Sequence, residues 1–168
     1  MQITNCTLAD IEKISELYEV ARQYQKIKSA TIWPIFSHNL IETDINEKRQ
    51  YKIIIDNEIA CIWTLTYKDP QIWEEKDNIF SIYIHRIATN PSFRGQNLVA
   101  IIIKWAKEYA QENNKKLIRL DTVGKNLGLI SHYEKLGFEY LGLFDLKDTS
   151  ELPEHYHNAA VSLFELSV

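Results

Sequence analysis

Four stretches of the chain place apolar residues at the three- and four-residue spacing of an amphipathic helix. The pattern is clearest over Leu98–Asn113. Proline suits the first turn of a helix that starts at Pro34, and glycine suits the left-handed position after a helix that ends just before Gly137. The spacing predicts four helices, at Ile11–Ala21, Pro34–Glu47, Leu98–Asn113 and Leu127–Lys135.

Most of the other apolar stretches are rich in β-branched and aromatic residues, which favours strands. Tyr51–Ile55 and Glu58–Tyr67 are separated by Asp56-Asn57, two residues that tolerate positive φ, and this pattern predicts a β-hairpin. Phe80–Thr89 is a further predicted strand, and Asn90-Pro91 ends it because proline lacks the donor that a ladder needs. The remaining predicted strands are Gln2–Cys6, Leu117–Thr122, Phe138–Leu146 and Val161–Leu166.

Two polar stretches separate these elements. Lys68–Asn78 is interrupted by Pro70 and is predicted to be a loop, and a long polar segment that contains Pro153 joins the last two strands. The sequence shows no internal repeat, low-complexity tract or evident linker. At a prior of about 150 residues per domain, the 168 residues are expected to form a single domain, 1–168.

Composition and charge narrow the class of protein. Hydrophobic residues make up 45% and charged residues 25%, which is typical of a globular chain. The net charge of −4, without a long run of lysine or arginine, argues against nucleic-acid binding. Met1–Glu12 lacks the features of a secretory signal and no apolar run approaches ~20 residues, so we expect a cytoplasmic protein with no membrane association. Cys6 and Cys61 lack metal-ligand spacing, and we expect two small buried side chains, no disulfide and no metal.

The segment Asn90–Val99 joins the end of a predicted strand to the start of the clearest helix. A turn there exposes unpaired backbone amides beside the positive end of the helix dipole, which suits an anionic phosphate group. Gly95 permits a close approach of backbone to ligand. The glycines and the lysine of a P-loop are missing, and on local chemistry alone an ordinary turn is the simpler interpretation.

A wider set of motifs resembles the GNAT superfamily of acetyl-CoA-dependent N-acetyltransferases. The run IHRIATNPSFRGQNLVAIIIKWA is followed by IRLDT, GKN and HYEKLGF. The resemblance is detailed over Ser81–Leu143 and extends in outline to the whole predicted element order. It implies an α/β (α+β) fold with a mixed, centrally splayed β-sheet flanked by helices on both faces.

The resemblance also implies that acetyl-CoA is the co-substrate. The family's pyrophosphate-binding pattern, Arg/Gln-x-x-Gly-x-Gly/Ala, opens at Arg94, but Asn97 and Val99 stand where glycines are usual. Asparagine tolerates positive φ, whereas Val99 narrows the space for the diphosphate. Backbone amides of Ile87–Thr89 are expected to bind the pantetheine arm and the carbonyl oxygen. The cofactor-binding residues implied by the resemblance are Ile87, Ala88, Thr89, Arg94, Gly95, Gln96, Asn97, Leu98, Val99, Asn126 and Tyr133.

Acetyl transfer from a thioester to an amine requires a neutral amine, a polarised carbonyl and a proton for the departing thiolate. By resemblance Tyr133 is the general acid; the alternative is a packing aromatic whose hydroxyl caps a turn. Asp121, at the end of a predicted strand, is one candidate base or else a ligand of nearby backbone amides. His85 alternates on the same strand face as Ile87 and Thr89, so it is the second candidate base or else a core histidine.

Several other residues allow two interpretations. Arg86 lies between apolar strand residues and needs a partner, either an acidic acceptor group or a carboxylate at the edge of the core. Trp33 and Trp73 lie near predicted loops and are candidates for the wall of an acceptor pocket, or simply core residues. His155 and His157 are expected to be exposed at a loop tip.

The expected function is therefore transfer of an acetyl group from acetyl-CoA to a small-molecule or peptide primary amine, by direct attack in a ternary complex. The irregular Asn97 and Val99 motivate an alternative, a non-catalytic acyl-CoA or nucleotide-binding module. A structural or interaction protein is a second alternative. A homodimer is also open, because exposed final strands in such folds often pair between subunits. Polyamines, amino acids, antibiotics, peptide N-termini and lysine all remain possible acceptors.

Overall fold

A computed structural model of the chain describes residues 1–28 and 30–168. These residues form two compact units. The first unit comprises Met1–Leu65 with His85–Val99, and the second comprises Thr66–Ile84 with Ala100–Val168. A single domain over the whole chain stays a prediction.

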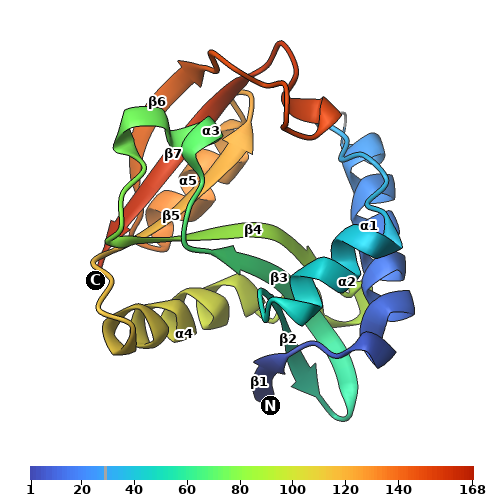
Figure 1. Cartoon of the computed structure of the whole chain (residues 1–168). Helices are drawn as coiled ribbons and strands as arrows, with labels where there is room; N and C mark the ends of the chain where they lie inside the picture. The colour runs from blue at the N-terminus through green and yellow to red at the C-terminus, as the bar shows by residue number, and fades with distance from the viewer. Residues whose placement is uncertain (29) are drawn as a thin grey trace. The chain divides into compact units, whose positions relative to one another are not determined.

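The elements follow the predicted order, as Figure 1 shows. The helices of the described residues are α1 (Ile11–Ile27), α2 (His38–Asn46), α3 (Pro70–Trp73), α4 (Leu98–Glu112) and α5 (Leu127–Lys135). The strands are β1 (Gln2–Asn5), β2 (Gln50–Ile55), β3 (Glu58–Thr66), β4 (Ser81–Thr89), β5 (Leu117–Val123), β6 (Glu139–Asp145) and β7 (Ala160–Ser167). Short 3-10 turns occur at η1 (Leu8–Asp10), η2 (Glu74–Lys76), η3 (Pro91–Phe93) and η4 (Glu154–Tyr156).

The described strands form a mixed, seven-stranded sheet in the order β1-β2-β3-β4-β5-β7-β6. Strands β1, β2 and β3 pair antiparallel, and so do β5, β7 and β6. Strand β4 pairs in parallel with β5 over Ser81–Tyr83, and its later residues, His85–Thr89, belong to the first unit. The mixed sheet with its flanking helices confirms the predicted α/β class.

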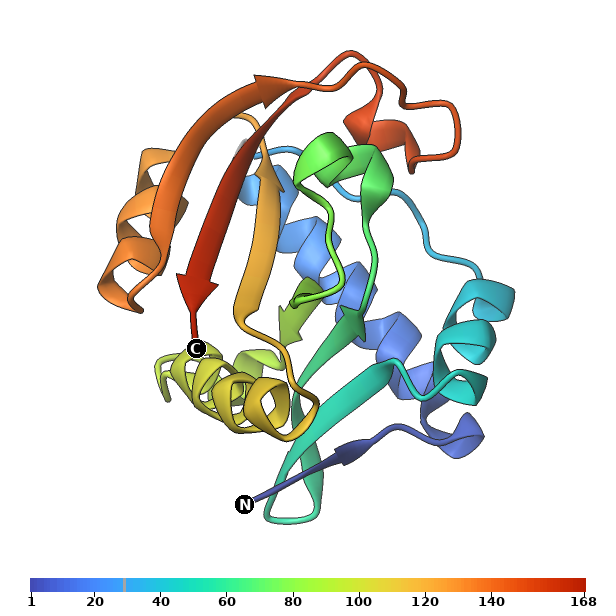
Figure 2. The ribbon, with the colours of Figure 1, turned by 60° about the vertical axis from the view of Figure 1, so that its left-hand side comes forward.

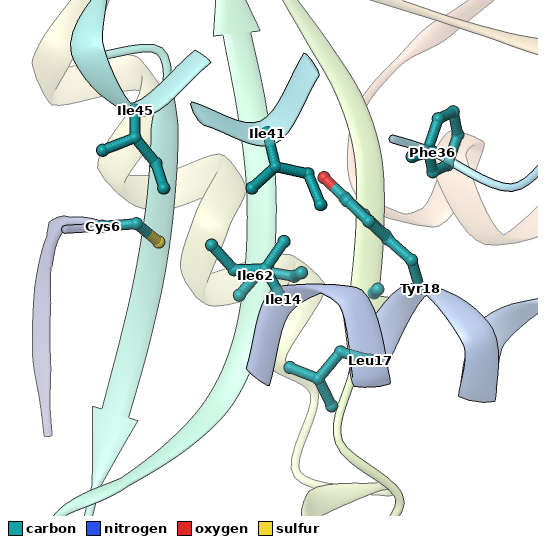
Figure 3. Close-up of a cluster of buried hydrophobic side chains, with 9 residues drawn as sticks. Cys6, Ile14, Leu17, Tyr18, Phe36, Ile41, Ile45 and Ile62 are labelled. Carbon is teal, nitrogen blue, oxygen red and sulfur yellow. The ribbon is translucent and has the colours of Figure 1, made fainter. Parts of the chain in front are cut away.

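The core of the first unit lies between the two early helices and the sheet. Figure 3 shows Ile14, Leu17 and Tyr18 of α1 beside Ile41 of α2 and Ile62 of β3. The three α1 residues follow helical spacing, so they share one face. Each apolar side chain of this size contributes about 1.5–3 kcal/mol on full burial. Packing of this face therefore holds α1 and α2 on the sheet.

In the second unit, helices cover both faces of the β5, β7 and β6 strands. Leu163 and Phe164 are successive residues of β7, so their side chains point to opposite faces. The ring of Phe164 lies 5.2 Å from that of Tyr133 in α5, whereas Leu163 belongs to a buried cluster with Trp73 of α3. Figure 2 shows α5 and α3 on opposite sides of these strands. Asp121 pairs across from Leu163, so it lies on the α3 face.

The predicted start of the second helix is wrong. The helix begins at His38 rather than at Pro34. The hydroxyl of Ser37 accepts a hydrogen bond from the backbone amide of Leu40 at 3.2 Å and caps the helix. Proline is compatible with a first turn, but a serine cap satisfies an amide that would otherwise be unpaired, and the cap determines the boundary.

The prediction of a plain loop over Lys68–Asn78 is also wrong. This segment contains α3, with Pro70 in its first turn, followed by η2. Ile72 and Trp73 are 4% and 1% exposed and pack on the sheet of the second unit. A four-residue helix is too short to show periodicity in the sequence, so only tertiary burial reveals it.

The predicted turns are confirmed. Asp56 and Asn57 take φ values of 49° and 63° between the two hairpin strands, and Gly137 takes φ 95° just after α5. Both cysteines, Cys6 and Cys61, are buried and neither is in a disulfide, as expected. None of the helices in the described part of the chain has the length and apolar character needed to span a bilayer.

Candidate functional site

The loop between β4 and α4 belongs to the first unit and starts at a buried anchor, Asn90. The amide of Asn90 donates to the carbonyl oxygen of Ala60 at 2.9 Å, and its side-chain nitrogen donates to that of Ile59 at 3.0 Å. Its side-chain oxygen accepts a hydrogen bond from the amide of Ser92. Asn90 thus fixes the loop to β3. The sequence interpretation treated it only as the end of a strand.

Beyond this anchor the loop presents its backbone to solvent. Residues 94–97 are exposed, and both Gly95 and Asn97 have positive φ, at 83° and 56°. A side-chain carbon added at Gly95 would meet no atom within 4 Å. Helix α4 begins at Leu98, and its first amides have no partner within the helix. Open backbone and a helix amino terminus together suit an anionic group.

Arg94 supplies a positive charge at the same loop. Its guanidinium carbon lies 4.5 Å from the ring centroid of Tyr24 in α1, in a cation–π contact. The left-handed conformation of Asn97 agrees with the tolerance expected of asparagine at the position where a glycine is usual.

The second half of β4 is irregular. Arg86 has φ 51°, which is rare for a bulky residue and interrupts the alternation of a strand. Strand alternation therefore does not place His85 on the same face as Ile87 and Thr89. Thr89 and Cys61 share a hydrogen bond of 3.4 Å between Oγ1 and Sγ.

The partner of Arg86 is a buried carboxylate. Arg86 forms an ion pair with Asp44, and Arg49 forms a second one with the same carboxylate at 2.9 Å. The interpretation that Arg86 pairs with a carboxylate at the edge of the core is confirmed. Two cations thus hold one acid in the first unit.

Neither tryptophan that was considered for an acceptor pocket is freely exposed. Trp33 is partly buried, with its ring 5.8 Å from that of Phe36, and Trp73 is 1% exposed. Both pack on core residues of their own units.

His85 is a poor proton acceptor. Burial, followed by the positive charges of Arg86 and Arg49, lowers the pKa of His85 to about 3. The imidazole is therefore neutral at physiological pH and holds a proton weakly.

Asp121 is better suited to accept a proton. It lies inside β5, which continues to Val123, so its predicted place at the strand end is wrong by two residues. The hydroxyl of Tyr156 donates a hydrogen bond to its Oδ2 at 2.8 Å. Burial raises the pKa of Asp121 to about 6, against the opposing effect of the Tyr156 hydrogen bond. A carboxylate with a pKa near the working pH is an effective base.

Asp69 is a residue that the sequence interpretation missed. Oxygens of the Asp69 and Asp121 carboxyl groups lie within 4.8 Å of one another. Burial, and next the charges of Asp121 and Asp77, raise the pKa of Asp69 to about 8. The pair Asp69-Pro70 is a helix-start signal that could have marked the position, although not its partner.

Tyr133 and Asn126, the two expected site residues of the α5 region, both make structural contacts. The partly buried ring of Tyr133 packs 5.2 Å from Phe164 and 5.8 Å from Phe138. The side-chain oxygen of exposed Asn126 accepts a hydrogen bond from the amide of Leu129 at 3.1 Å and caps α5. The side-chain nitrogen of Asn126 is then the group that suits a cofactor contact.

His155 and His157, in the segment between β6 and β7, differ in exposure. His157 is exposed, as expected. The expectation of exposure is wrong for His155, which is partly buried and packs 4.3 Å from the ring of Tyr156. Burial, followed by the charge of His157, lowers the pKa of His155 to about 4. The hydrogen bond from Tyr156 to Asp121 holds this part of the segment on the sheet.

Comparison with known proteins identifies relatives of this chain. A curated relative, the uncharacterized N-acetyltransferase YesJ of Bacillus subtilis, is 33% identical over 107 residues. The match covers 57% of this chain and 59% of YesJ, so the chain spans about six tenths of that relative's length.

Two solved structures share the fold. An acetyltransferase of the GNAT family from Listeria monocytogenes has a TM-score of 0.78 at 21% identity, covering 99% of this chain and 94% of that one. The protein yncA from Salmonella typhimurium, solved with its cofactor acetyl-CoA, has a TM-score of 0.71 at 13% identity, covering 99% of this chain and 93% of that one. The model of the Acetyltransferase (GNAT) family matches residues 55–138, which is half of the chain. The chain therefore belongs to the GNAT family of acetyltransferases.

Proposed function

We propose that this chain transfers the acetyl group of acetyl-CoA to a primary amine by direct attack in a ternary complex. The observation that carries the proposal is the exposed loop of residues 94–97, with its two positive φ values, directly before α4 in a chain of the GNAT family. The acetyl-CoA in the Salmonella structure, which has the same fold, supports the choice of donor.

In this proposal the loop binds the diphosphate of acetyl-CoA. The amides that precede and open α4 supply hydrogen-bond donors without a partner in the helix, and Arg94 supplies a positive charge. Amides of Ile87–Thr89 bind the pantetheine arm and the thioester oxygen. Asn126 contributes the side-chain nitrogen that its helix cap leaves unused.

The reaction forms a bond between the amine nitrogen and the carbonyl carbon and breaks the bond from that carbon to sulfur. Tyr133 packs on the α5 face of the sheet and Asp121 lies on the α3 face, so the proposal requires the thioester to lie at an edge of the sheet that both side chains reach. There Tyr133 gives its hydroxyl proton to the departing thiolate. Asp121 takes a proton from the amine, and its raised pKa favours it over His85, whose pKa is lowered. The neighbouring Asp69 also suits binding of the acceptor ammonium beside Asp121 before it loses that proton.

The test is release of CoA from acetyl-CoA during incubation with a panel of primary amines. Tyr133→Phe keeps the packing ring and removes the hydroxyl, so it should lower kcat by ~10²-fold or more, the usual effect of losing a general acid. Affinity for CoA, measured by calorimetry, should change little. An unchanged kcat, in an assay where chemistry limits the rate, would leave Tyr133 a packing residue. No release with any amine, despite CoA binding, would indicate a non-catalytic module.

A further inference from the structure

A cavity of about 240 Å³ lies in the second unit, between the α3–η2 segment and the end of β6, which run side by side in Figure 1. Its apolar lining residues are Ile72, Trp73, Phe144, Leu146 and Leu163, of which Ile72, Trp73 and Leu163 are at most 4% exposed. An apolar cavity of about 150 Å³ holds a benzene molecule. This cavity therefore has room for an aromatic ring with a short side chain.

The mouth of the cavity is charged. Glu74 and Lys147 form an ion pair at 2.8 Å, and the Lys147 amide also donates to Glu74 at 3.4 Å. Glu74 has φ 45°, an unfavourable conformation for this residue type that these contacts help to maintain. Lys147 neutralises Glu74. The charges that remain are the two acids Glu75 and Asp145 and one base, Lys76, whose ammonium group lies over the Phe144 ring. The mouth is net negative and disfavours a carboxylate.

The cavity lies on the same face of the sheet as Asp121. Leu163, which lines it, pairs directly with Asp121 across β7 and β5. Side chains of directly opposed strand residues lie about 5 Å apart. A molecule in the cavity therefore lies on the same face of the sheet as the Asp121 carboxyl group, beside the strand that pairs with β5.

We propose that this cavity binds the skeleton of the acetyl acceptor, and that the acceptor is a primary amine on an aromatic or branched aliphatic group without a carboxylate. The proposal rests on the proposed function in so far as the bound molecule is an acceptor. The apolar wall binds the skeleton, the acidic mouth excludes anions, and Asp121 meets the amine end.

The experiment compares 2-phenylethylamine with ethylamine, which has a similar amino group and no ring. Leu146→Trp fills the cavity from a partly buried position after β6. It should lower kcat/KM for 2-phenylethylamine by about 10-fold or more, and leave ethylamine unchanged. Leu143→Trp is the matched control, because Leu143 is 45% exposed on β6 and does not line the cavity. Leu146→Ala enlarges the cavity and should raise kcat/KM for the bulkier tryptamine, a gain that misfolding cannot produce.

Direct binding separates this proposal from the proposed function. 2-Phenylethanol has no amine to acetylate, and calorimetry should show that it binds the wild type but not Leu146→Trp. Binding with this pattern, without acetylation of any amine, would retain the cavity as a ligand site and overturn the transferase activity. Two results would overturn the cavity as the acceptor site. One is that Leu146→Trp lowers kcat/KM equally for both amines, and the other is that this variant still binds 2-phenylethanol.

Discussion

Asp69 and Asp121 place two carboxyl groups within 4.8 Å of one another in the second unit. Two like charges in a buried setting cannot both ionise without a large energetic cost, so such a pair holds a proton that isolated carboxyl groups would lose. Burial raises the pKa of Asp121 to about 6, and burial followed by the charges of Asp121 and Asp77 raises the pKa of Asp69 to about 8. Around neutral pH the pair therefore carries one negative charge.

The pair should make folding stability depend on pH. An aspartate in an unfolded chain has a pKa of about 3.9, so between pH 4 and about 8 the folded protein keeps a proton on Asp69 that the unfolded chain releases. Stability then falls as pH rises through this window. Asp69→Asn removes the effect, and its Tm relative to wild type should increase from pH 5 to pH 8. Scanning calorimetry measures this difference, and two parallel Tm curves would contradict the assignment.

The ionisation of Asp121 should also appear in the pH dependence of kcat/KM. Asp121 acts as a base only when ionised, so kcat/KM of the wild type should rise with pH through about 6. Asp121→Asn should lower kcat/KM and remove this inflection. His85→Gln should retain it, since the lowered pKa of His85 keeps that ring neutral from pH 5 to 8. If both variants keep the inflection, the amine loses its proton to water instead.

For single residues, the sequence identifies candidates better than it predicts which of them contact one another. Asp121, Arg86 and Asn97 were each identified from local pattern or resemblance, and the conformation expected of Asn97 is observed. The nearness of Asp69 to Asp121 could not be read, because the two residues are distant in the chain and tertiary packing brings them together.

Among the elements, the amino terminus of α5 offers a test that separates structure from binding. Asn126 caps this helix through its side-chain oxygen, and the proposed cofactor contact uses its nitrogen. Asn126→Ser keeps a capping oxygen and removes the nitrogen, so it should weaken CoA binding with little change in Tm. Asn126→Ala removes both and should also cost about 1 kcal/mol of stability. Calorimetric titration and thermal unfolding of both variants check this. Equal CoA affinity in Asn126→Ser and wild type would limit Asn126 to the cap.

Long helices were located correctly because their periodicity is averaged over many residues, but their ends were not always predicted. Helix α1 begins at Ile11 as predicted and runs to Ile27, six residues beyond the predicted end at Ala21. Helix α4 occupies Leu98–Glu112, one residue shorter than the predicted range. Short elements were predicted poorly. Helix α3 has four residues, and the burial of Ile72 and Trp73 against strands from other parts of the chain stabilises it. Helix α2 starts directly after the capping residue Ser37, although Pro34 is also a helix-start signal.

For the whole molecule, acetyl-CoA should act as a stabilising ligand. At a concentration 100 times its Kd, a ligand that binds only the folded state adds about 2.7 kcal/mol, or roughly 5 °C or more in Tm for a chain of this size. Gly95→Val should lose most of this shift, because a branched side chain at φ 83° strains the loop and covers its amides. Asn97→Gly should keep it. Each shift is measured from the variant's own unliganded Tm, and a full shift in Gly95→Val would place the diphosphate elsewhere.

The order of the strands in the sheet could not be predicted from the sequence. Strand β7 lies between β5 and β6, so the last strand of the chain pairs with both of its predecessors. Apolar and polar alternation identifies a strand and its two faces but does not name its neighbours. The same holds for the two compact units, since each combines distant segments of the chain.

The hydrogen bond from Tyr156 to Asp121 has a consequence for limited proteolysis. It ties the segment between β6 and β7, where Glu151, Pro153 and Glu154 are exposed, to the sheet of the second unit. A protease cuts such a segment when it opens locally, and opening is easier when the tether is weaker. An ionised carboxylate accepts a hydrogen bond more strongly than a protonated one. The rate of cleavage in this exposed segment therefore reports the charge on the partly buried carboxyl group of Asp121.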